Sequence, residues 1–382
     1  MKVYLVGGAV RDRLLDLPVG ERDWVVVGAT PDEMLAEGYR QVEGDFPVFL
    51  HPETGDEYAL ARTEVKNGPG YQGFRVECGP DIRLEQDLLR RDLTINALAM
   101  DEAGNLIDVC HGEDDLREGL LRHITPAFIE DPVRLLRIAR FAAKLGRWGF
   151  RVAHGTHRLM KAMAASEDLM SLRPERIWRE MGKAFTEPQP WRFFEVLHRC
   201  GALERLLPEV AAGMGLAAGH GKGEPAKAVT ALKRVVAVTD DRVVRCAAAL
   251  FGAVRQQTDP ELWMDSLRID KAARLLLNDL LHFNRQVLGD DRAEPLLKLV
   301  MRLKPQQQPE RFRRFLLASC GLWPEPMITL APHLELTGEI VAAGAPPDLT
   351  ASGLEGRALG TAIQAWRVAR LEEALRAMGA SN

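Results

Sequence analysis

Short apolar runs separated by turn signals fill the first part of the chain. Residues 1–6 and 21–27 have the length of buried strands, and a Gly-Gly pair followed by the helical pattern of 9–17 lies between them. Thr30 is placed to cap a short helix over 31–37. Further strands are predicted over 46–50, 57–62 and 106–108. This part of the chain is therefore predicted to form a small mixed sheet with short helices.

From residue 84 onward the apolar spacing becomes mostly helical. Helical patterns cover 84–99, 114–119, 132–146, 174–180 and 191–200. Gly, Ala and Lys dominate 213–229, which predicts a linker, and amphipathic helices interrupted by prolines follow it. The fold class is therefore predicted to be α+β, with the sheet in the N-terminal part and helices after it.

Composition places the chain among globular proteins. Its 382 residues are 46% hydrophobic and 27% charged, which is enough to bury a core in two or three domains. No charged leader with an apolar segment opens the sequence, and no apolar run reaches the length of a membrane span. The five cysteines show no paired spacing, so we expect reduced thiols and a cytoplasmic protein.

The strongest chemical signal is a pair of acids at the start of a predicted strand. Glu21 and Asp23 lie two residues apart, so on a strand they share a face with side-chain roots roughly 7 Å apart. Such carboxylates suit Mg²⁺, which prefers oxygen ligands. The Gly7-Gly8 turn brings backbone N–H groups toward phosphates. Together these features predict a nucleoside triphosphate site, although either one alone also fits a tight turn or a solvated surface.

Other polar residues are candidates for the same site. Glu57 shares a strand face with two alanines, which leaves room for a third metal-facing carboxylate or describes an acid on an edge strand. Arg91, Asp92 and Asn96 are suited to ribose and phosphate contacts. The glycine-rich residues 66–73 predict a loop that could cover the site.

A basic block stands out in a chain whose net charge is −4. Residues 132–166 contain no Asp or Glu and eight cations: Arg134, Arg137, Arg140, Lys144, Arg147, Arg151, Arg158 and Lys161. On the helix over 132–146 the first four form a stripe opposite an apolar face, and Asp131 is a candidate cap for that helix. The block indicates contact with a nucleic-acid backbone, with a solvated surface as the alternative.

These motifs resemble those of a known family. The order and spacing of Gly7-Gly8-Ala9-Val10-Arg11-Asp12, Glu21-x-Asp23, Arg90-Arg91-Asp92, Glu130-Asp131-x-x-Arg134 and Glu175-Arg176-x-x-x-Glu180 are similar to those of the class II CCA-adding enzymes, the bacterial tRNA nucleotidyltransferases. The resemblance runs from residue 1 to about 210 and looks closest to the enterobacterial type.

The resemblance implies a polymerase-β-type nucleotidyltransferase head (1–125), a helical neck (126–210) and a helical body and tail (211–382). It implies addition of the 3′-terminal CCA of tRNA from CTP and ATP with two Mg²⁺ ions. Carried over, Glu21 and Asp23 hold metal, and Glu57, whose strand face leaves room for a third carboxylate, is a further catalytic candidate. Asp131 and Arg134 read the base. The remaining nucleotide contacts are Gly8, Arg11, Arg91, Asp92, Asn96, Arg137 and Arg140.

The partners implied are tRNA, CTP and ATP, with no membrane, and we expect a monomer. Two features depart from the family pattern. Glu21 stands where an Asp is usual, and on a strand the longer side chain would misplace a metal by up to about 1 Å and lower the rate roughly 10²-fold. The C-terminal region lacks a His-Asp hydrolase pair at 243–252. The alternatives are a poly(A) polymerase, an enzyme adding only CC or only A, and an inactive tRNA-binding relative.

Overall fold

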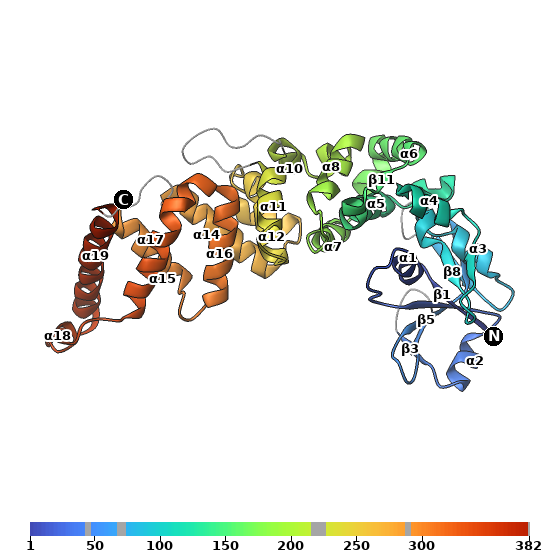
Figure 1. Cartoon of the computed structure of the whole chain (residues 1–382), viewed down its shortest axis with the longest axis horizontal. Helices are drawn as coiled ribbons and strands as arrows, with labels where there is room; N and C mark the ends of the chain where they lie inside the picture. Colours follow the sequence, from blue (N-terminus) through green and yellow to red (C-terminus); the bar gives the residue numbers. More distant parts are fainter. Residues whose placement is uncertain (43–46, 67–73, 215–226, 287–291, 381–382) are drawn as a thin grey trace. The chain divides into compact units, whose positions relative to one another are not determined.

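The computed structural model describes residues 1–42, 47–66, 74–214, 227–286 and 292–380. The chain divides into two compact units (Figure 1). The first comprises residues 1–180 and 192–206, and the second comprises 181–191 and 207–382. No helix among the described residues combines the length and the apolar character needed to cross a bilayer. All but the first residue of the loop predicted over 66–73, and most of the predicted linker, lie outside the described residues.

The first unit contains a seven-stranded mixed sheet in the order β3-β4-β5-β2-β1-β8-β9. Only the pairing of β2 with β5 is parallel among these neighbours. The strands are β1 (Lys2–Val6), β2 (Asp23–Val27), β3 (Arg40–Val42), β4 (Val48–Leu50), β5 (Glu57–Leu60), β8 (Leu98–Met100) and β9 (Leu106–Asp108). A separate hairpin pairs β6 (Arg62–Lys66) with β7 (Phe74–Cys78). The predicted polymerase-β-type head with a mixed sheet is confirmed, and the pattern analysis missed β3, β7, β8 and most of β6.

Short helices accompany this sheet. They are α1 (Gly8–Leu14), α2 (Pro31–Ala36), α3 (Leu84–Leu89) and α4 (Gly112–Glu118). Thr30 caps α2 as predicted, because its side chain accepts from the Glu33 N–H while the Glu33 carboxylate accepts from the Thr30 N–H. Apolar residues on the two faces of the sheet form separate clusters, one around Val25 and one around Val26.

Helices dominate the remainder of the first unit. They are α5 (Val133–Leu145), α6 (His154–Ala165), α7 (Pro174–Ala184), α8 (Trp191–Cys200) and α9 (Ala202–Leu206), although the end of α7 from Met181 and the first residue of α8 belong to the second unit. The predicted apolar face of α5 is fully buried at Leu135, Ile138, Ala142 and Leu145. One departure from an all-helical neck is the two-residue strand β11 (Arg151–Val152), which pairs with β10 (Leu120–Leu121).

The second unit is helical throughout its described residues. Its helices are α10 (Pro208–Gly213), α11 (Ala228–Val236), α12 (Arg242–Val254), α13 (Pro260–Ser266), α14 (Lys271–Gln286), α15 (Ala293–Leu303), α16 (Pro309–Leu322), α17 (Pro324–Ala342), α18 (Pro347–Thr350) and α19 (Gly356–Ala380). Helix α12 packs against α11, α14 and α16. Edge-to-face rings of Phe251, Phe283, Phe315 and Trp323 fill the space between them.

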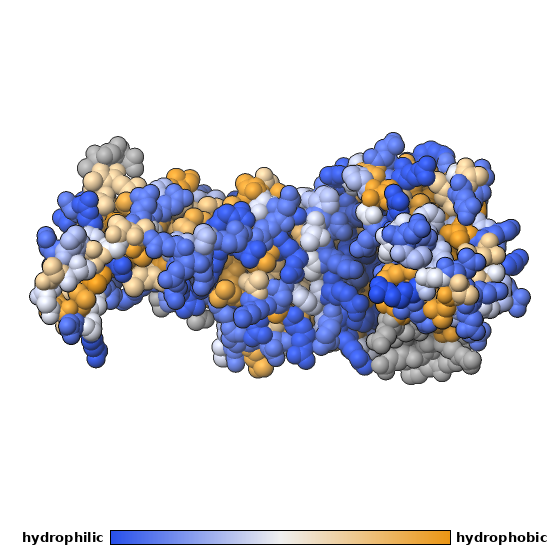
Figure 2. Space-filling model, turned by 90° about the horizontal axis from the view of Figure 1, so that it is seen from below, coloured by the Kyte–Doolittle hydropathy of each residue, from blue (hydrophilic) through white to orange (hydrophobic). Residues whose placement is uncertain are grey.

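Buried charges in the second unit are paired within it. Asp279 is fully buried and accepts two hydrogen bonds from Arg311 and one from Arg302. Arg245 on α12 donates to three backbone carbonyls, those of Thr239, Phe185 and Glu187. On the face seen in Figure 2, apolar surface is scattered among hydrophilic residues. Singly exposed apolar residues such as Ile328 are normal on a globular surface.

Candidate functional site

One pocket of about 970 Å³ in the first unit gathers the predicted site residues. Its walls come from α1, β2, β5, the segment after α3, and α5, with Arg176 of α7 at its lining. The predicted residues that line it are Gly8, Arg11, Asp23, Glu57, Arg91, Asp92, Asn96, Asp131, Arg134, Arg137 and Arg140. Glu21 alone among the predicted residues is not part of the lining. Segments separated by more than a hundred residues therefore meet at one place, as the resemblance implies.

The acidic edge of the pocket lies at the start of β2. Asp23 is the first residue of this strand and pairs with Val6 of β1 on one side and with Glu57 of β5 on the other. In neighbouring strands, residues in register project to the same face. The carboxylates of Asp23 and Glu57 therefore lie side by side on the face that lines the pocket.

The prediction that Glu21 lies on the same strand is wrong. Strand β1 ends at Val6, which pairs with Asp23, so no neighbouring strand remains to pair with residue 21. Glu21 instead occupies an exposed bend before β2. It still acts on the site, because its charge helps to raise the pKa of Asp23.

The electrostatics of Asp23 fit a cation. Burial raises the pKa of Asp23 most, the charge of Arg91 lowers it, and the charge of Glu21 raises it again, with a net increase. A divalent ion would offset this clustered negative charge, and carboxylate oxygens are the hard ligands that Mg²⁺ takes. Within the described residues, no three acidic, imidazole or thiolate side chains gather closely enough to hold a metal by themselves. An ion here would therefore take further ligands from a bound substrate.

The glycine turn is shaped by Arg91. Gly7 has φ +67°, and a Cβ atom at this position would lie 2.8 Å from Nη1 of Arg91. Arg91 is held in place because its Nε and Nη2 donate to Asp87 at 3.3 and 3.0 Å, while its Nη1 donates to the Asn96 carbonyl at 3.4 Å. Only glycine allows both this backbone conformation and the close approach of the guanidinium.

The predicted helix over 84–99 is wrong. Helix α3 ends at Leu89, a 3₁₀ turn covers Thr94–Asn96, and β8 begins at Leu98. The side chain of Asp92 accepts from the N–H of Leu93 and from Asn96 Nδ2, which gives the backbone a local alternative to the helix. The helical apolar spacing is therefore overridden by polar side chains that turn toward the pocket.

The cations of the α5 stripe have partners from other segments. Arg137 Nε donates to Asp92 at 2.6 Å, Arg140 Nε to Glu180 at 2.7 Å and Lys144 Nζ to Asp12 at 2.9 Å. Arg134 donates to the backbone carbonyls of Ala127 and Arg90. The stripe lines the pocket. The sequence window that contains it has no acids, so these partners could not be seen from local composition.

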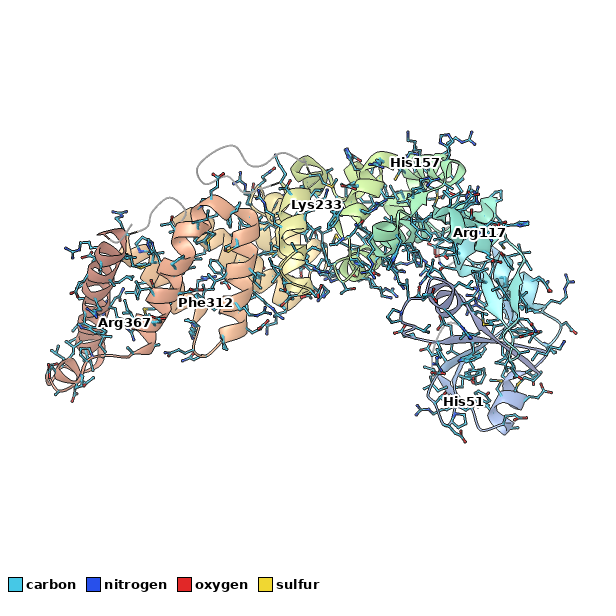
Figure 3. The ribbon with its side chains drawn as sticks, viewed as in Figure 1. His51, Arg117, His157, Lys233, Phe312 and Arg367 are labelled. Carbon is cyan, nitrogen blue, oxygen red and sulfur yellow. The ribbon has the colours of Figure 1, made fainter. Side chains whose placement is uncertain are left out.

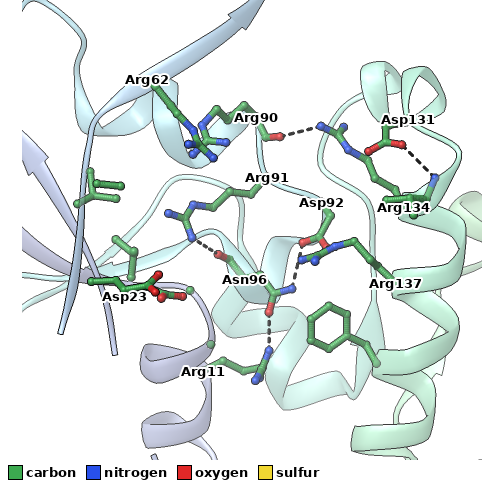
Figure 4. A pocket seen from close by; sticks show the side chains of 18 of the residues that line it. Arg11, Asp23, Arg62, Arg90, Arg91, Asp92, Asn96, Asp131, Arg134 and Arg137 are labelled. Atoms are coloured by element: carbon green, nitrogen blue, oxygen red, sulfur yellow. Dashed lines mark hydrogen bonds and ion pairs between the residues drawn. The ribbon is translucent and has the colours of Figure 1, made fainter. Parts of the chain in front are cut away.

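A chain of hydrogen bonds links Arg137 to Lys144 by way of α1 and the segment after α3, and Figure 4 shows its part from Arg137 to Arg11. Asp92 accepts from Arg137 and from Asn96, and the Asn96 side-chain oxygen accepts from Arg11 at 2.6 Å. Arg11 in turn donates to Asp12, which also accepts from Lys144. Burial alone raises the pKa of Asp92, but its cationic and amide partners lower it to about 2. The network thus fixes α1, the segment after α3, and α5 as one rigid arrangement.

Asp131 and Arg134 lie at the wall of the pocket near Arg176. Asp131 Oδ1 accepts from the N–H of Val133 at 3.1 Å, but the N-cap of α5 is Pro132, so the prediction that Asp131 caps this helix is wrong by one residue. Both Asp131 oxygens also accept from Arg176, each at 3.2 Å. The sequence analysis did not assign roles to Arg176 or to Glu180, although the Glu175-Arg176-x-x-x-Glu180 spacing contained both signals.

The second half of the basic block lies elsewhere. Arg147, Arg151, Arg158 and Lys161 are exposed, and none of them lines the pocket. Helix α6 is separated from α1 by α5 (Figure 1), and His157, labelled in Figure 3, lies on α6 next to the exposed Arg158. The block therefore divides into a stripe that faces the pocket and an exposed group.

Comparison with protein families identifies two segments. Residues 3–122 match the poly A polymerase head domain, and residues 149–214 match the probable RNA- and SrmB-binding site of polymerase A. The first match contains the acidic edge and the glycine turn. The second contains α6, α8 and three of the four exposed cations of the basic block, Arg151, Arg158 and Lys161.

Curated relatives match nearly the whole chain. The multifunctional CCA protein of Thioalkalivibrio sulfidiphilus is 44% identical over 98% of this chain and 98% of its own length. The CCA-adding enzyme of Pseudomonas putida is 43% identical over 97% of this chain and 99% of its own. Among solved structures, a CCA-adding enzyme in apo form II has a TM-score of 0.70 at 22% identity, covering 100% of this chain and 92% of that one. A tRNA nucleotidyltransferase complexed with a primer tRNA and an incoming ATP analog has a TM-score of 0.63 at 22% identity, with coverages of 89% and 96%. These structures share the fold.

Proposed function

Because this chain belongs to the family of CCA-adding enzymes, we propose that its pocket is where CMP and AMP are transferred from CTP and ATP to the 3′ end of tRNA with release of pyrophosphate. The observation that carries this proposal is the meeting of the family's motifs around one pocket, in a chain more than two-fifths identical to those enzymes. The chain is a nucleotidyltransferase that processes tRNA.

Asp23 and Glu21 would hold Mg²⁺, with Glu57 beside Asp23 on the neighbouring strand. When bound, such ions activate the tRNA 3′-hydroxyl and stabilise the triphosphate and the leaving pyrophosphate. Asp23 and Glu57 concentrate negative charge at the start of the paired strands β2 and β5, and this charge attracts and holds a divalent ion.

Gly8, Arg11 and Arg91 would hold the triphosphate. Arg11 and Arg91 are both fixed by neighbouring carboxylates, Asp12 and Asp87, so little side-chain freedom is lost when a phosphate binds. Arg137 and Arg140 add positive charge from α5 at the same pocket. Asp92 and Asn96 act with them as ribose and phosphate contacts or as the residues that orient these cations.

Asp131 and Arg134 would select the base. A carboxylate has about four acceptor sites, and the contacts with Arg176 and with the Val133 N–H use three of them. The carboxylate thus has capacity to accept from a base amino group while the cap and the ion pair persist. Arg176 fixes the plane of the carboxylate, and a fixed donor and acceptor pair discriminates between bases because a wrong base leaves polar groups unpaired.

Asp131→Ala tests this assignment. We expect incorporation of UTP and GTP to rise relative to CTP and ATP, with a smaller change in triphosphate affinity. Unaltered selectivity accompanied by a lower unfolding temperature would assign Asp131 to capping alone. Glu175→Ala is the matched control, because Glu175 is exposed and adjacent to Arg176.

The decisive assay is metal-dependent transfer of labelled CMP and AMP to tRNA lacking its 3′ end. Incubation with CTP alone, ATP alone and both together separates full CCA addition from CC-only or A-only addition. Long adenylate tails on generic RNA would indicate a poly(A) polymerase. Complete absence of transfer with intact tRNA binding would indicate an inactive tRNA-binding relative.

Contact with the tRNA backbone is assigned to the exposed half of the basic block. Exposed cations bind phosphates without sequence information and give a salt-dependent affinity. Replacing Arg151, Arg158 and Lys161 by Ala should weaken all tRNAs alike and flatten the salt dependence. The predicted tRNA contact of the α5 stripe is tested by the same measurement on Arg137→Ala, Arg140→Ala and Lys144→Ala.

The finer features of the resemblance belong to the same proposal. The chain is of the enterobacterial-like type, it acts as a monomer, and residues 211–382 form a body and tail that bind tRNA behind a head and a neck. No His-Asp pair occupies 243–252, where Arg245 and Cys246 are buried in α12. The full-length protein should therefore show no phosphatase or phosphodiesterase activity with Ni²⁺, Mn²⁺ or Mg²⁺. Metal-dependent turnover of a cyclic phosphodiester would overturn this assignment.

A further inference from the structure

Arg11 is almost enclosed by groups that neutralise it. Its side chain is 3% exposed, its Nε and Nη2 donate to Asp12 Oδ1 at 2.8 and 2.7 Å, and its Nη1 donates to Asn96 Oδ1 at 2.6 Å. Its guanidinium also lies 5.2 Å from the centroid of the Phe141 ring. A buried arginine paired this closely with one carboxylate presents little net positive charge to a ligand.

Arg11 nevertheless faces the pocket. It is part of the lining, and a Cβ atom added to Gly8 would lie 3.5 Å from its Nη2. The guanidinium therefore points at the glycine turn. Asp12, in contrast, is not part of the lining and lies behind Arg11.

Lys144 restores the charge balance from another element. It reaches from the last turn of α5 and donates to the second oxygen of Asp12, Oδ2, at 2.9 Å. The three side chains Arg11, Asp12 and Lys144 thus carry a net charge of one positive unit rather than zero. Lys144 is 28% exposed, whereas Asp12 is 10% exposed, so the carboxylate is enclosed between the two cations.

We propose that Lys144 is a positioning residue for triphosphate binding, because it offsets the charge of Asp12 and so leaves the charge of Arg11 available to the phosphates. Asp12 fixes the direction of the Arg11 guanidinium, and Lys144 prevents the negative charge of Asp12 from cancelling the positive charge of Arg11. This proposal rests on the proposed function, in which Arg11 and Gly8 hold the triphosphate. It goes further by assigning roles to Asp12 and Lys144, neither of which is among the proposed triphosphate contacts.

The test compares Lys144→Met with the double variant Asp12→Asn plus Lys144→Met. In Lys144→Met the three positions carry no net charge, and we expect KM for CTP and for ATP to rise by the same factor, about tenfold or about 1.4 kcal/mol, with little change in kcat. In the double variant the net charge is again one positive unit, so KM should recover most of the loss. Lys144→Arg should also recover it.

The inhibition constant of inorganic tripolyphosphate is a measurement that a loss of packing alone would not change. As a competitive inhibitor it carries no base, so its inhibition constant should rise in Lys144→Met by the same factor as KM and recover in the double variant. Discrimination between CTP and UTP should stay unchanged, because base selection uses other residues. Lys2→Met, an exposed lysine on β1, is the control for removing a positive charge.

The outcomes separate the two proposals. A wild-type protein that transfers no nucleotide would contradict the proposed function before any variant is compared. An active wild type with unchanged KM in folded Lys144→Met would overturn the role of Lys144. A double variant no better than Lys144→Met would also overturn it, because Lys144 would then act through its own phosphate contact or through packing.

Discussion

Replacing Asp92 by Asn should destabilise the fold by about 2 to 3 kcal/mol at neutral pH. The Asp92 side chain is 7% exposed and accepts from Arg137 at 2.6 Å. Burial alone raises its pKa, but the charge of Arg137 leads the interactions that lower it to about 2. Relative to an unfolded value of about 3.9, the difference is about 2 pKa units, each of which corresponds to about 1.4 kcal/mol.

The sign of the effect sets its pH dependence. A carboxyl whose pKa falls on folding stabilises the fold above its unfolded pKa, and this contribution is lost as the pH falls through the folded pKa. The difference in unfolding free energy between wild type and Asp92→Asn should therefore stay constant from about pH 7 to about pH 5. It should shrink progressively between about pH 4 and about pH 2.

Urea unfolding followed by circular dichroism over this pH range measures the difference directly. The exposed Asp81→Asn is the matched control and should change the midpoint little at any pH. Arg137→Gln in the Asp92→Asn background should cost much less than in wild type, since the ion pair is already broken. A cost well below 1 kcal/mol at neutral pH, or a cost that does not change in acid, would refute the reasoning.

Three further variants test the acidic edge and the turn. Asp23→Asn should abolish transfer and the stabilisation by Mg²⁺, yet leave the metal-free unfolding temperature at neutral pH equal or higher. The pKa of Asp23 is raised in the folded protein, so its charged form opposes folding increasingly as the pH rises through the unfolded pKa. A metal-free unfolding temperature below that of the wild type would contradict this. Gly7→Ala should lower the free energy of unfolding in urea by about 1 to 3 kcal/mol and remove most of the activity, because Gly7 has a positive φ and a Cβ atom there would clash with Arg91. Gly20→Ala is the control and should be neutral, because Gly20 has open space around it. Glu21→Asp should reduce nucleotide transfer in a Mg²⁺ titration, because Glu21 lies in a bend before β2 and a shorter side chain withdraws its carboxylate from the site. Equal or higher transfer would instead support the sequence-based expectation that Glu21 lowers the rate relative to an Asp.

Local patterns predicted the elements whose formation depends on local interactions. The helix over 191–200 has the predicted bounds, and Thr30 caps α2 through a side chain three residues from its partner. The buried face of α5 follows from apolar spacing within one helix. In these places neighbouring residues contain all the information, so the sequence analysis and the structure agree.

Elements that depend on distant partners were mispredicted. The start of β2 is fixed by the end of β1 at Val6, a limit that the apolar run itself does not contain. The helix predicted over 84–99 ends early because Asp92 and Asn96 bond to each other and to groups far along the chain. Eleven of the twelve predicted site residues nevertheless line the pocket, because the resemblance supplied the spacing of motifs that local patterns could not connect.

The α5 stripe shows why charge counted in a sequence window misleads. Arg137, Arg140 and Lys144 lie three and four residues apart on one helix face, a spacing at which like charges repel. Their acids come from α1, the segment after α3, and α7, so the repulsion is offset only when all these segments are in place. A triphosphate site needs cations held close together before the ligand arrives, and acids placed behind them allow this without a ligand present. The same acids make the site dependent on the complete fold, which is why the sequence window alone could not show that this stripe lines a pocket.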